Sequence, residues 1–137
     1  TLGKLTEEMV AAKVLKLFQN LGYEVGKAGR NIRFYKGSKR LAEIDIFLEN
    51  GEVVVAVEVK TSLTVRDVNV HKERISRIRE YMDERGDKRK IIGAAAGGVV
   101  PDDVREYAQQ QGFYVLVQSG ESICLAETAP GFEVKQW

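Results

Sequence analysis

Two apolar strands joined by a short turn dominate the first half of the sequence. Residues 41–49 and 53–60 are rich in Ile, Leu and Val, and Asn50-Gly51 separates them. An Asn-Gly pair between apolar runs predicts a type I′ hairpin turn, in which both turn residues have positive φ. The run 53–57 is apolar at every position, so we expect its strand to be central in the sheet and covered on both faces.

Charged side chains occupy regular positions on these two strands. Because side chains alternate along a strand, we expect the odd-numbered residues of 43–47 on one face and the even-numbered residues of 44–48 on the other. By the same rule, Glu58 and Lys60 share one face of the second strand. Acidic groups gathered at the ends of buried strands need a counter-charge, which is commonly a divalent metal ion. The pattern therefore directs the search for chemistry to this pair of strands.

Helical patterns precede and follow the two strands. Between residues 6 and 22, apolar side chains recur at steps of three and four, which predicts an amphipathic helix. A second apolar stripe extends over about 65–86 within a densely charged segment. A third helix is expected to open at Pro101 and to end at Gly112.

The remaining segments predict further strands. Short β-prone pieces are expected at 23–27 and 31–36, with Ala28-Gly29-Arg30 as their connection. Residues 90–96 and 113–117 predict two buried strands that flank the third helix, and Gly97-Gly98 is expected to form a turn. A β-α-β unit of this kind has parallel strands and a right-handed crossover.

The resulting order of elements is α-β-β-β-α-β-α-β, with residues 121–126 as a further edge strand. This order predicts an α/β fold in which one central mixed β-sheet is flanked by helices. A length of 137 residues fits a single domain over 1–137, and the sequence leaves open whether this domain belongs to a longer protein.

Composition narrows the class of protein. Hydrophobic residues make up 44% of the chain and charged residues 30%, as in ordinary folded proteins. The net charge is +1, so any positive patch must be local. The single cysteine, Cys124, lies in an apolar stretch and is expected to be a buried, inert thiol, which suits a cytoplasmic location. The longest uncharged apolar stretch, 91–100, is shorter than the roughly 20 residues that cross a bilayer.

The order of elements, with Asp45 on one strand and Glu58-Val59-Lys60 at the end of the next, resembles the PD-(D/E)xK nuclease superfamily. That superfamily includes restriction endonucleases and archaeal Holliday-junction resolvases. In its pattern, a hydrophobic strand carries Asp and the following strand ends in Glu-x-Lys before a helix. The segments 43–48 and 58–62 fit this pattern, and the rest of the chain is similar to a poorly characterised branch of the superfamily. The resemblance covers nearly the whole chain and implies a restriction-endonuclease-like core.

The resemblance also implies a Mg²⁺ site in which Mn²⁺ can substitute. Asp45 and Glu58 would ligate the cation directly, and the Val59 carbonyl would supply a third oxygen, since Mg²⁺ prefers hard oxygen ligands. The cation would lower the pKa of a bound water and neutralise the scissile phosphate. Lys60 would orient the attacking water and offset developing negative charge. The implied function is metal-dependent hydrolysis of DNA phosphodiester bonds.

An acid in the first helix completes the set that the resemblance implies. Glu8 is our choice as a catalytic group and metal ligand, either for a second metal ion or through a bridging water. Glu7 is a close rival, because it falls on the apolar stripe of Val10, Val14 and Phe18. The alternative role for both acids is to complement the helix dipole. We expect the helix acid to converge with Asp45 and the Glu58/Lys60 pair within a few ångströms.

A locally basic segment precedes the strand that carries Asp45, and it is a candidate nucleic-acid contact. Between residues 27 and 40 the chain has six positive residues and no acid. They are Lys27, Arg30, Arg33, Lys36, Lys39 and Arg40. Contacts with backbone phosphates would make binding depend steeply on salt. The alternative is an exposed hairpin that its charges keep soluble.

Other interpretations stay open. The two acids and Lys60 could form a structural salt-bridge cluster, and Glu43 could be a further ligand or a solvated acid. His71 lies on the apolar stripe of its helix and is expected to be a core residue rather than a ligand. The alternative function is a catalytically silent nuclease-fold module that binds nucleic acid or a protein partner. DNA is the expected substrate, and nothing in the sequence excludes RNA. Cleavage of both strands would suggest a homodimer, although no residue indicates one.

Overall fold

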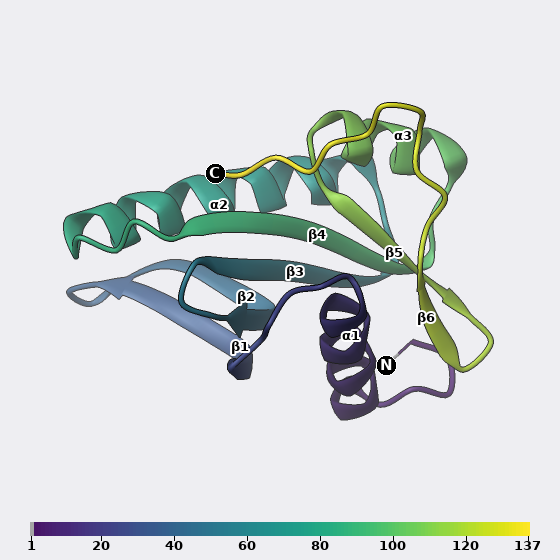
Figure 1. Ribbon diagram of the computed structural model, residues 1–137, viewed down its shortest axis with the longest axis horizontal. Helices are drawn as coiled ribbons and strands as arrows, with labels where there is room; N and C mark the ends of the chain where they lie inside the picture. The colour runs from purple at the N-terminus through teal and green to yellow at the C-terminus, as the bar shows by residue number, and fades with distance from the viewer. Residues whose placement is uncertain (1) are drawn as a thin grey trace.

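The computed structural model of the protein describes residues 2–137 and contains one six-stranded sheet and three helices (Figure 1). The helices are α1 (Glu7–Asn20), α2 (Val65–Glu84) and α3 (Asp102–Gln110). The strands are β1 (Lys27–Lys36), β2 (Lys39–Glu49), β3 (Val53–Ser62), β4 (Lys90–Val99), β5 (Tyr114–Ser119) and β6 (Ser122–Leu125). This order confirms the predicted α/β fold with a mixed sheet, and β6 is the expected edge strand. No helix within residues 2–137 is long and apolar enough to cross a membrane.

The strands lie in the sheet in their order along the chain, from β1 at one edge to β6 at the other. The strands β1, β2 and β3 pair antiparallel, and so do β5 and β6. The strands β3, β4 and β5 pair parallel. Parallel neighbours need a crossover connection, and α2 and α3 supply the two crossovers.

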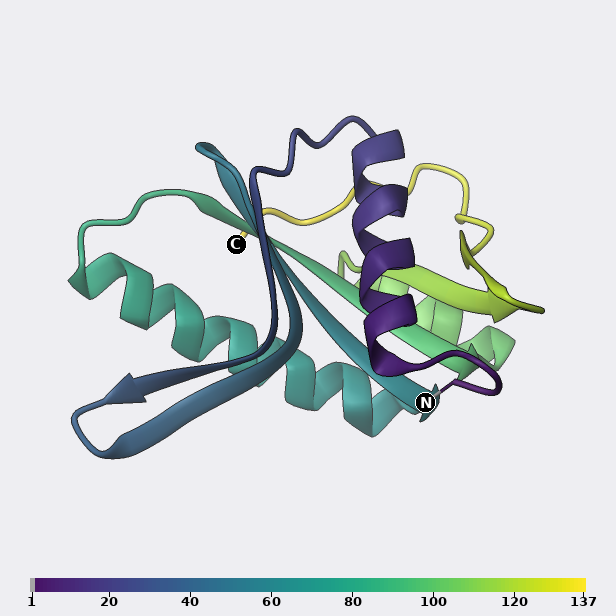
Figure 2. The ribbon, with the colours of Figure 1, turned by 90° about the horizontal axis from the view of Figure 1, so that it is seen from below.

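Helices cover both faces of the sheet, with α2 and α3 on one face and α1 on the other (Figures 1 and 2). Side chains of β3 alternate between the two layers. Val54 and Ala56 pack in the apolar cluster under α2, whereas Val55 and Val57 pack in the cluster under α1. All four are buried, which confirms the prediction of a central strand that is covered on both sides.

The helix α2 is held along the sheet by its apolar stripe and by its first turn. The predicted stripe is buried along its whole length. It consists of Val68, His71, Ile75, Ile78 and Met82. The Thr64 hydroxyl accepts a hydrogen bond from the Asp67 N–H, and the Asp67 carboxylate accepts one of 2.9 Å from the Thr64 N–H. This reciprocal capping box fixes the start of α2 directly after β3.

The turn between β2 and β3 differs from the prediction. Neither Asn50 nor Gly51 has positive φ, so the turn is not type I′. The Asn50 side chain instead accepts hydrogen bonds from the N–H groups of Glu52 (2.7 Å) and Val53 (2.8 Å). Asn side chains can bond the backbone two residues on in this way, which closes the turn without left-handed residues.

Two segments that were expected as connections lie within strands. Ala28-Gly29-Arg30 belongs to β1, and residues 23–26 form no strand. Gly97-Gly98 belongs to β4. A Cβ atom at Gly98 would lie 2.8 Å from the Thr61 carbonyl oxygen, so the close approach of backbone at this point requires glycine.

Cys124 is exposed, and its expected burial is therefore wrong. It lies in β6, where its neighbours Ile123 and Leu125 pack toward the cluster under α1. Alternation along the strand directs the cysteine between them to the other face, which is not covered at this edge of the sheet.

Candidate active site

The strand β2 loses its regular alternation at Asp45. Ile44 packs in the cluster under α2, whereas Ile46 and Leu48 pack in the cluster under α1. Phe47 lies on the α2 side again, three residues after Ile44. The expectation that Ile44, Ile46 and Leu48 share one face is therefore wrong. The register of β2 against β1 is the same on both sides of Asp45, so neither strand has an inserted residue at this point.

The strand β1 is irregular at the matching position. Asn31 and Asp45 lie between the paired residues Arg30–Ile46 and Ile32–Ile44 of β1 and β2, and Asn31 has a φ of +53°. Gly29 and Ile32 share a face across Asn31, because a Cβ atom at Gly29 would lie 2.8 Å from the Ile32 side chain. Asn adopts this left-handed conformation more readily than most residues. Both strands thus bend at one point, and the hairpin beyond it extends away from the rest of the sheet (Figure 2).

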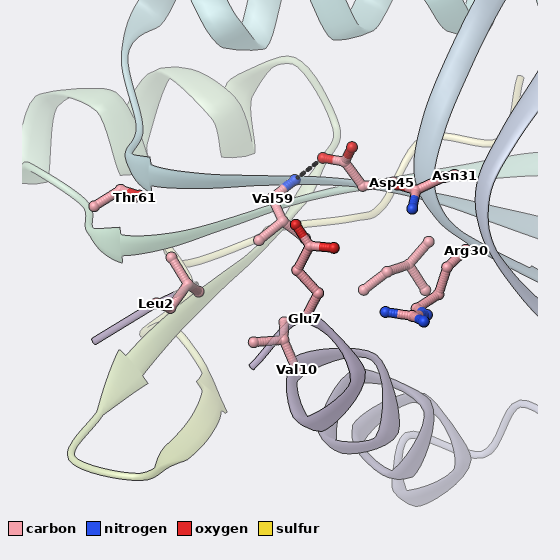
Figure 3. A pocket seen from close by; sticks show the side chains of 9 residues that line it. Leu2, Glu7, Val10, Arg30, Asn31, Asp45, Val59 and Thr61 are labelled. Carbon is pink, nitrogen blue, oxygen red and sulfur yellow. Dashed lines mark hydrogen bonds between the residues drawn. The ribbon is translucent and has the colours of Figure 1, made fainter. Parts of the chain in front are cut away.

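The pairing of β2 with β3 ends at the same point, and the Asp45 side chain continues the contact. The last paired residues are Ile46 and Val57. Beyond them, Asp45 Oδ2 accepts a hydrogen bond of 2.8 Å from the Val59 N–H (Figure 3). Because the N–H and C=O of one residue lie on the same side of a strand, the Val59 carbonyl also faces the opening between β2 and β3. A carboxylate and a carbonyl oxygen therefore border one opening.

Glu58 lies beside this opening on the α2 face of β3. Its side chain is 7% exposed, and its carboxylate forms an ion pair with the Arg74 guanidinium of α2. Burial raises the pKa of Glu58 well above the usual 4.5, and the neighbouring Asp45 carboxylate raises it further. Arg74 and Lys60 act in the opposite direction without outweighing burial. The positive charges near Asp45 and Glu58 therefore do not fully compensate the two carboxylates.

Lys60 extends from the same face of β3, and its amine is turned toward the start of α2. Its Nζ lies 3.8 Å from Asp67 Oδ1, and the lysine side chain is 43% exposed. An ion pair of this length and exposure is weak. The amine can therefore leave Asp67 and turn toward the acids at little energetic cost.

The structure brings Glu7, rather than Glu8, toward Asp45. Glu7, Asp45 and Val59 line a cavity of about 130 Å³, and the Glu7 carboxylate points from α1 toward the strands (Figure 3). Glu8 is exposed and does not line this cavity. Neighbouring helix residues are rotated by about 100°, and Glu7 is the one that shares a face with the buried Val10.

Glu7 and Glu58 approach Asp45 from opposite sides of the sheet. The helix α1 covers one face, and alternation along β3 directs Glu58 to the other. Within residues 2–137, no three His, Cys, Asp or Glu side chains gather closely enough to hold a metal ion together. The expected convergence of a helix acid with Asp45 and Glu58 around one cation is therefore not what the structure shows.

The remaining donors still fit a hard divalent cation. Mg²⁺ commonly takes one or two carboxylates and keeps several of its waters. Asp45, Glu58 and the Val59 carbonyl supply such a set at the opening between two strands. Burial raises the pKa of Glu58 most and the nearby Asp45 carboxylate raises it further, and a bound cation would offset both effects.

The six basic residues of the predicted nucleic-acid contact lie along the β1–β2 hairpin, and all are exposed. Glu43 pairs with two of them, at 2.6 Å from Arg33 and 3.5 Å from Arg40. Lys36 lies 3.2 Å from Glu84 of α2. These pairs are on the surface and are weak, so the charges remain accessible to a ligand.

Of the six, Arg30 alone lines the cavity beside Asp45. Its guanidinium lies on the α1 side of the strands, as does the Glu7 carboxylate (Figure 3). Asn31 lines the same cavity. Arg30 thus belongs to the basic β1–β2 hairpin and also lies beside the acidic residues Glu7 and Asp45.

His71 is fully buried, which confirms its prediction as a core residue. Its Nε2 donates a hydrogen bond of 3.0 Å to the Ala56 carbonyl, while Nδ1 has no partner within the described residues. Burial lowers the pKa of His71 from 6.5 to about 4, so the ring is neutral at physiological pH.

Sequence reasoning missed two residues at the opening, Asn31 and Arg74. Arg74 is one of several arginines in α2, and its distance along the sequence from Glu58-Val59-Lys60 does not distinguish it from the others as a partner of Glu58. Asn31 had a usable signal, because an Asn two residues after Gly29 in a strand favours a backbone irregularity.

Comparison with known proteins identifies a family whose function is undefined. Residues 2–116 match the family described as Domain of unknown function (DUF4143). The chain belongs to this family. The DUF4143 fold is similar to the crystal structure of AF1548, a protein of unknown function, with a TM-score of 0.56 and 12% sequence identity. The similarity covers 82% of this chain and 58% of AF1548, so the chain spans less than two thirds of that protein. No curated protein matches the sequence.

Proposed function

We propose that this DUF4143 domain is a metal-dependent nuclease that hydrolyses DNA phosphodiester bonds. The observation that carries the proposal is the neighbouring pair of acids, Asp45 and Glu58, where β2 and β3 separate. Lys60 follows two residues further along β3. The resemblance to the PD-(D/E)xK superfamily supports the same assignment, because these residue types occupy the strands that its pattern requires.

Each group at the opening has a task that its position supports. Asp45, Glu58 and the Val59 carbonyl would hold Mg²⁺ or Mn²⁺. When bound, the cation supplies positive charge to the scissile phosphate and makes a water more acidic. Lys60 would turn from Asp67, orient the attacking water and offset the negative charge that develops on the phosphoryl oxygens.

Arg30 and the other exposed basic residues of the β1–β2 hairpin support a nucleic-acid substrate. Arg30 lines the cavity beside Asp45, which suits a contact with a backbone phosphate next to the cleaved bond. Contacts of this kind position the substrate and carry no sequence information. The proposal therefore includes DNA as the substrate class and assigns no preferred sequence.

A second candidate function is a module that binds nucleic acid or a partner without cutting it. The ion pairs of Glu58 with Arg74 and of Lys60 with Asp67 favour this alternative, because both motif residues already have partners. The 43% exposure of Lys60 and the weakness of its contact weigh against it.

Cleavage of supercoiled plasmid DNA tests the proposal. We expect the wild-type domain to nick or linearise the plasmid with Mn²⁺ or Mg²⁺, and to stop when EDTA is added. The Asp45→Ala variant should bind the plasmid in a gel-shift assay but leave it intact. Equal DNA binding by both proteins without any cleavage would favour the binding module instead. Cleavage by Asp45→Ala at the wild-type rate would place the activity elsewhere.

A further inference from the structure

The Glu58 carboxylate has a counter-charge that lies outside the nuclease motif. Its partner is the Arg74 guanidinium, which reaches it from α2. The motif lysine, Lys60, contacts Asp67 instead. The most direct positive charge on a candidate metal ligand is therefore an arginine of the neighbouring helix.

A counter-charge at Glu58 lowers the energetic cost of burying a carboxylate beside a second one. Glu58 is 7% exposed and lies next to a second carboxylate, that of Asp45. Two acids in a site with little water are stable only when positive charge is near them. The Arg74 guanidinium supplies such a charge to Glu58.

We propose that Arg74 is a built-in counter-ion, which holds Glu58 while the site is without a divalent cation and gives up Glu58 when a cation binds. The inference rests on the proposed function, because it takes Glu58 as a ligand of the cation. Arg74 is then a positioning residue that acts through Glu58, and its charge sets how tightly the site binds a cation.

The geometry of Arg74 suits such an exchange. Its neighbours on α2, His71 and Ile75, are fully buried and fix the helix on the sheet. The Arg74 side chain itself is 29% exposed, so the guanidinium has access to solvent. It can withdraw from Glu58 without movement of α2. A guanidinium that remained beside a divalent cation would be repelled, which favours withdrawal.

Calorimetric titration of the intact domain with Mn²⁺ tests this inference without any measurement of activity. The variant is Arg74→Gln, and the matched control is Arg77→Gln. Arg77 lies one turn further along α2, is half-exposed and has its ion pair with Glu73 at 3.9 Å. Both variants remove one positive charge from the same helix, so their difference isolates the contact with Glu58.

We expect Arg74→Gln to bind Mn²⁺ on the order of tenfold more tightly than Arg77→Gln, because the competing charge on Glu58 is gone. Arg74→Lys keeps the positive charge and should return the affinity to near the wild-type value. If Arg74→Gln folds poorly, Arg74→Lys takes its place as the test variant. If the Arg74–Glu58 ion pair were purely structural, the Mn²⁺ affinity of the variants would not follow the charge at position 74.

Two results would overturn the inference. One leaves the nuclease proposal intact, and the other contradicts that proposal as well. If the wild type binds Mn²⁺ and Arg74→Gln binds it no more tightly than Arg77→Gln, Arg74 is a structural residue and the nuclease proposal stands. If the wild type and Arg77→Gln bind no Mn²⁺ or Mg²⁺, the proposed function fails, and the role of Arg74 fails with it.

Discussion

Asp45 Oδ2 accepts a hydrogen bond of 2.8 Å from the backbone N–H of Val59, just beyond the last paired residues of β2 and β3. The side chain thus takes the place of a backbone acceptor where the two strands separate. Asp45 has a structural task and a proposed chemical one, and substitutions of different kinds can separate them.

Asp45→Asn should abolish Mn²⁺-dependent DNA cleavage while preserving the fold. The amide oxygen can still accept the hydrogen bond from Val59, whereas the charge that would hold the cation is lost. Asp45→Ala should lose cleavage and also lower the free energy of unfolding by about 1–3 kcal/mol, because the Val59 N–H loses its partner. Plasmid cleavage and urea unfolding measure the two effects. Cleavage retained by Asp45→Asn would remove this residue from the chemistry.

Lys60→Ala should abolish cleavage and leave Mn²⁺ binding and stability nearly unchanged. The lysine makes one weak contact, at 3.8 Å from Asp67, so its loss costs the fold less than about 1 kcal/mol. Lys88→Ala is a suitable control, since Lys88 is exposed and precedes β4 at the opposite end of the parallel pair β3–β4. Single-turnover cleavage and calorimetry are the measurements. A Lys60→Ala protein as active as Lys88→Ala would contradict the assigned role.

His71 should make the domain less stable as the pH falls. Burial lowers its pKa from 6.5 to about 4, so between these values the unfolded chain binds a proton that the folded protein does not. The stability that His71 contributes is complete above pH 6.5, and it decreases as the pH falls toward 4 by up to about 3 kcal/mol.

The measurement for His71 is the free energy of urea unfolding at several pH values for the wild type and His71→Leu. Other groups titrate in both proteins, so the informative quantity is the difference between the two curves. The curves should converge as the pH falls from 6.5 to 4. Parallel curves over that range would show that His71 titrates normally.

Glu58 should make cation binding depend on pH. Its pKa in the folded protein lies above the usual 4.5, so below that raised pKa the binding of Mg²⁺ must expel a proton. The affinity for Mg²⁺ should therefore rise with pH, by up to about tenfold per pH unit, and level off above the pKa of Glu58. Calorimetry in buffers of different ionisation enthalpy counts the released protons. An affinity that stays constant from acidic to alkaline pH would exclude Glu58 as a ligand.

Arg30→Ala should weaken DNA binding to a similar extent for all sequences. It should also lower the slope of log affinity against log salt by about 1, as expected for the loss of one phosphate contact. Arg33→Ala is the comparison, because Arg33 lies on the same strand but does not line the cavity beside Asp45. Fluorescence anisotropy at several salt concentrations gives both slopes. Equal slopes for the two variants would mean that the cavity residue has no special place in binding.

Much of the fold follows from apolar periodicity. The stripe from Val68 to Met82 predicted α2 and its buried face, and the run 53–57 predicted a central strand. These predictions succeed because burial of apolar side chains dominates long, regular elements. The position of Glu7 on the stripe of Val10 likewise pointed to the acid that lines the cavity.

The details at the opening could not be derived in the same way. The even-numbered apolar residues from Ala42 to Leu48 suggest an uninterrupted face, although the strand changes face at Asp45. Phe47, an apolar residue on the expected charged face, was the one local sign of this change. The partner of Glu58 depends on how α2 packs against β3, and a tertiary contact of that kind leaves no spacing rule in the sequence.

The helix α2 contacts three alternate positions of β3, through His71 at Ala56, Arg74 at Glu58 and Asp67 at Lys60. A displacement of this helix along the strand would disturb all three contacts together. The packing of α2 against β3 therefore sets the positions of Glu58 and Lys60 together.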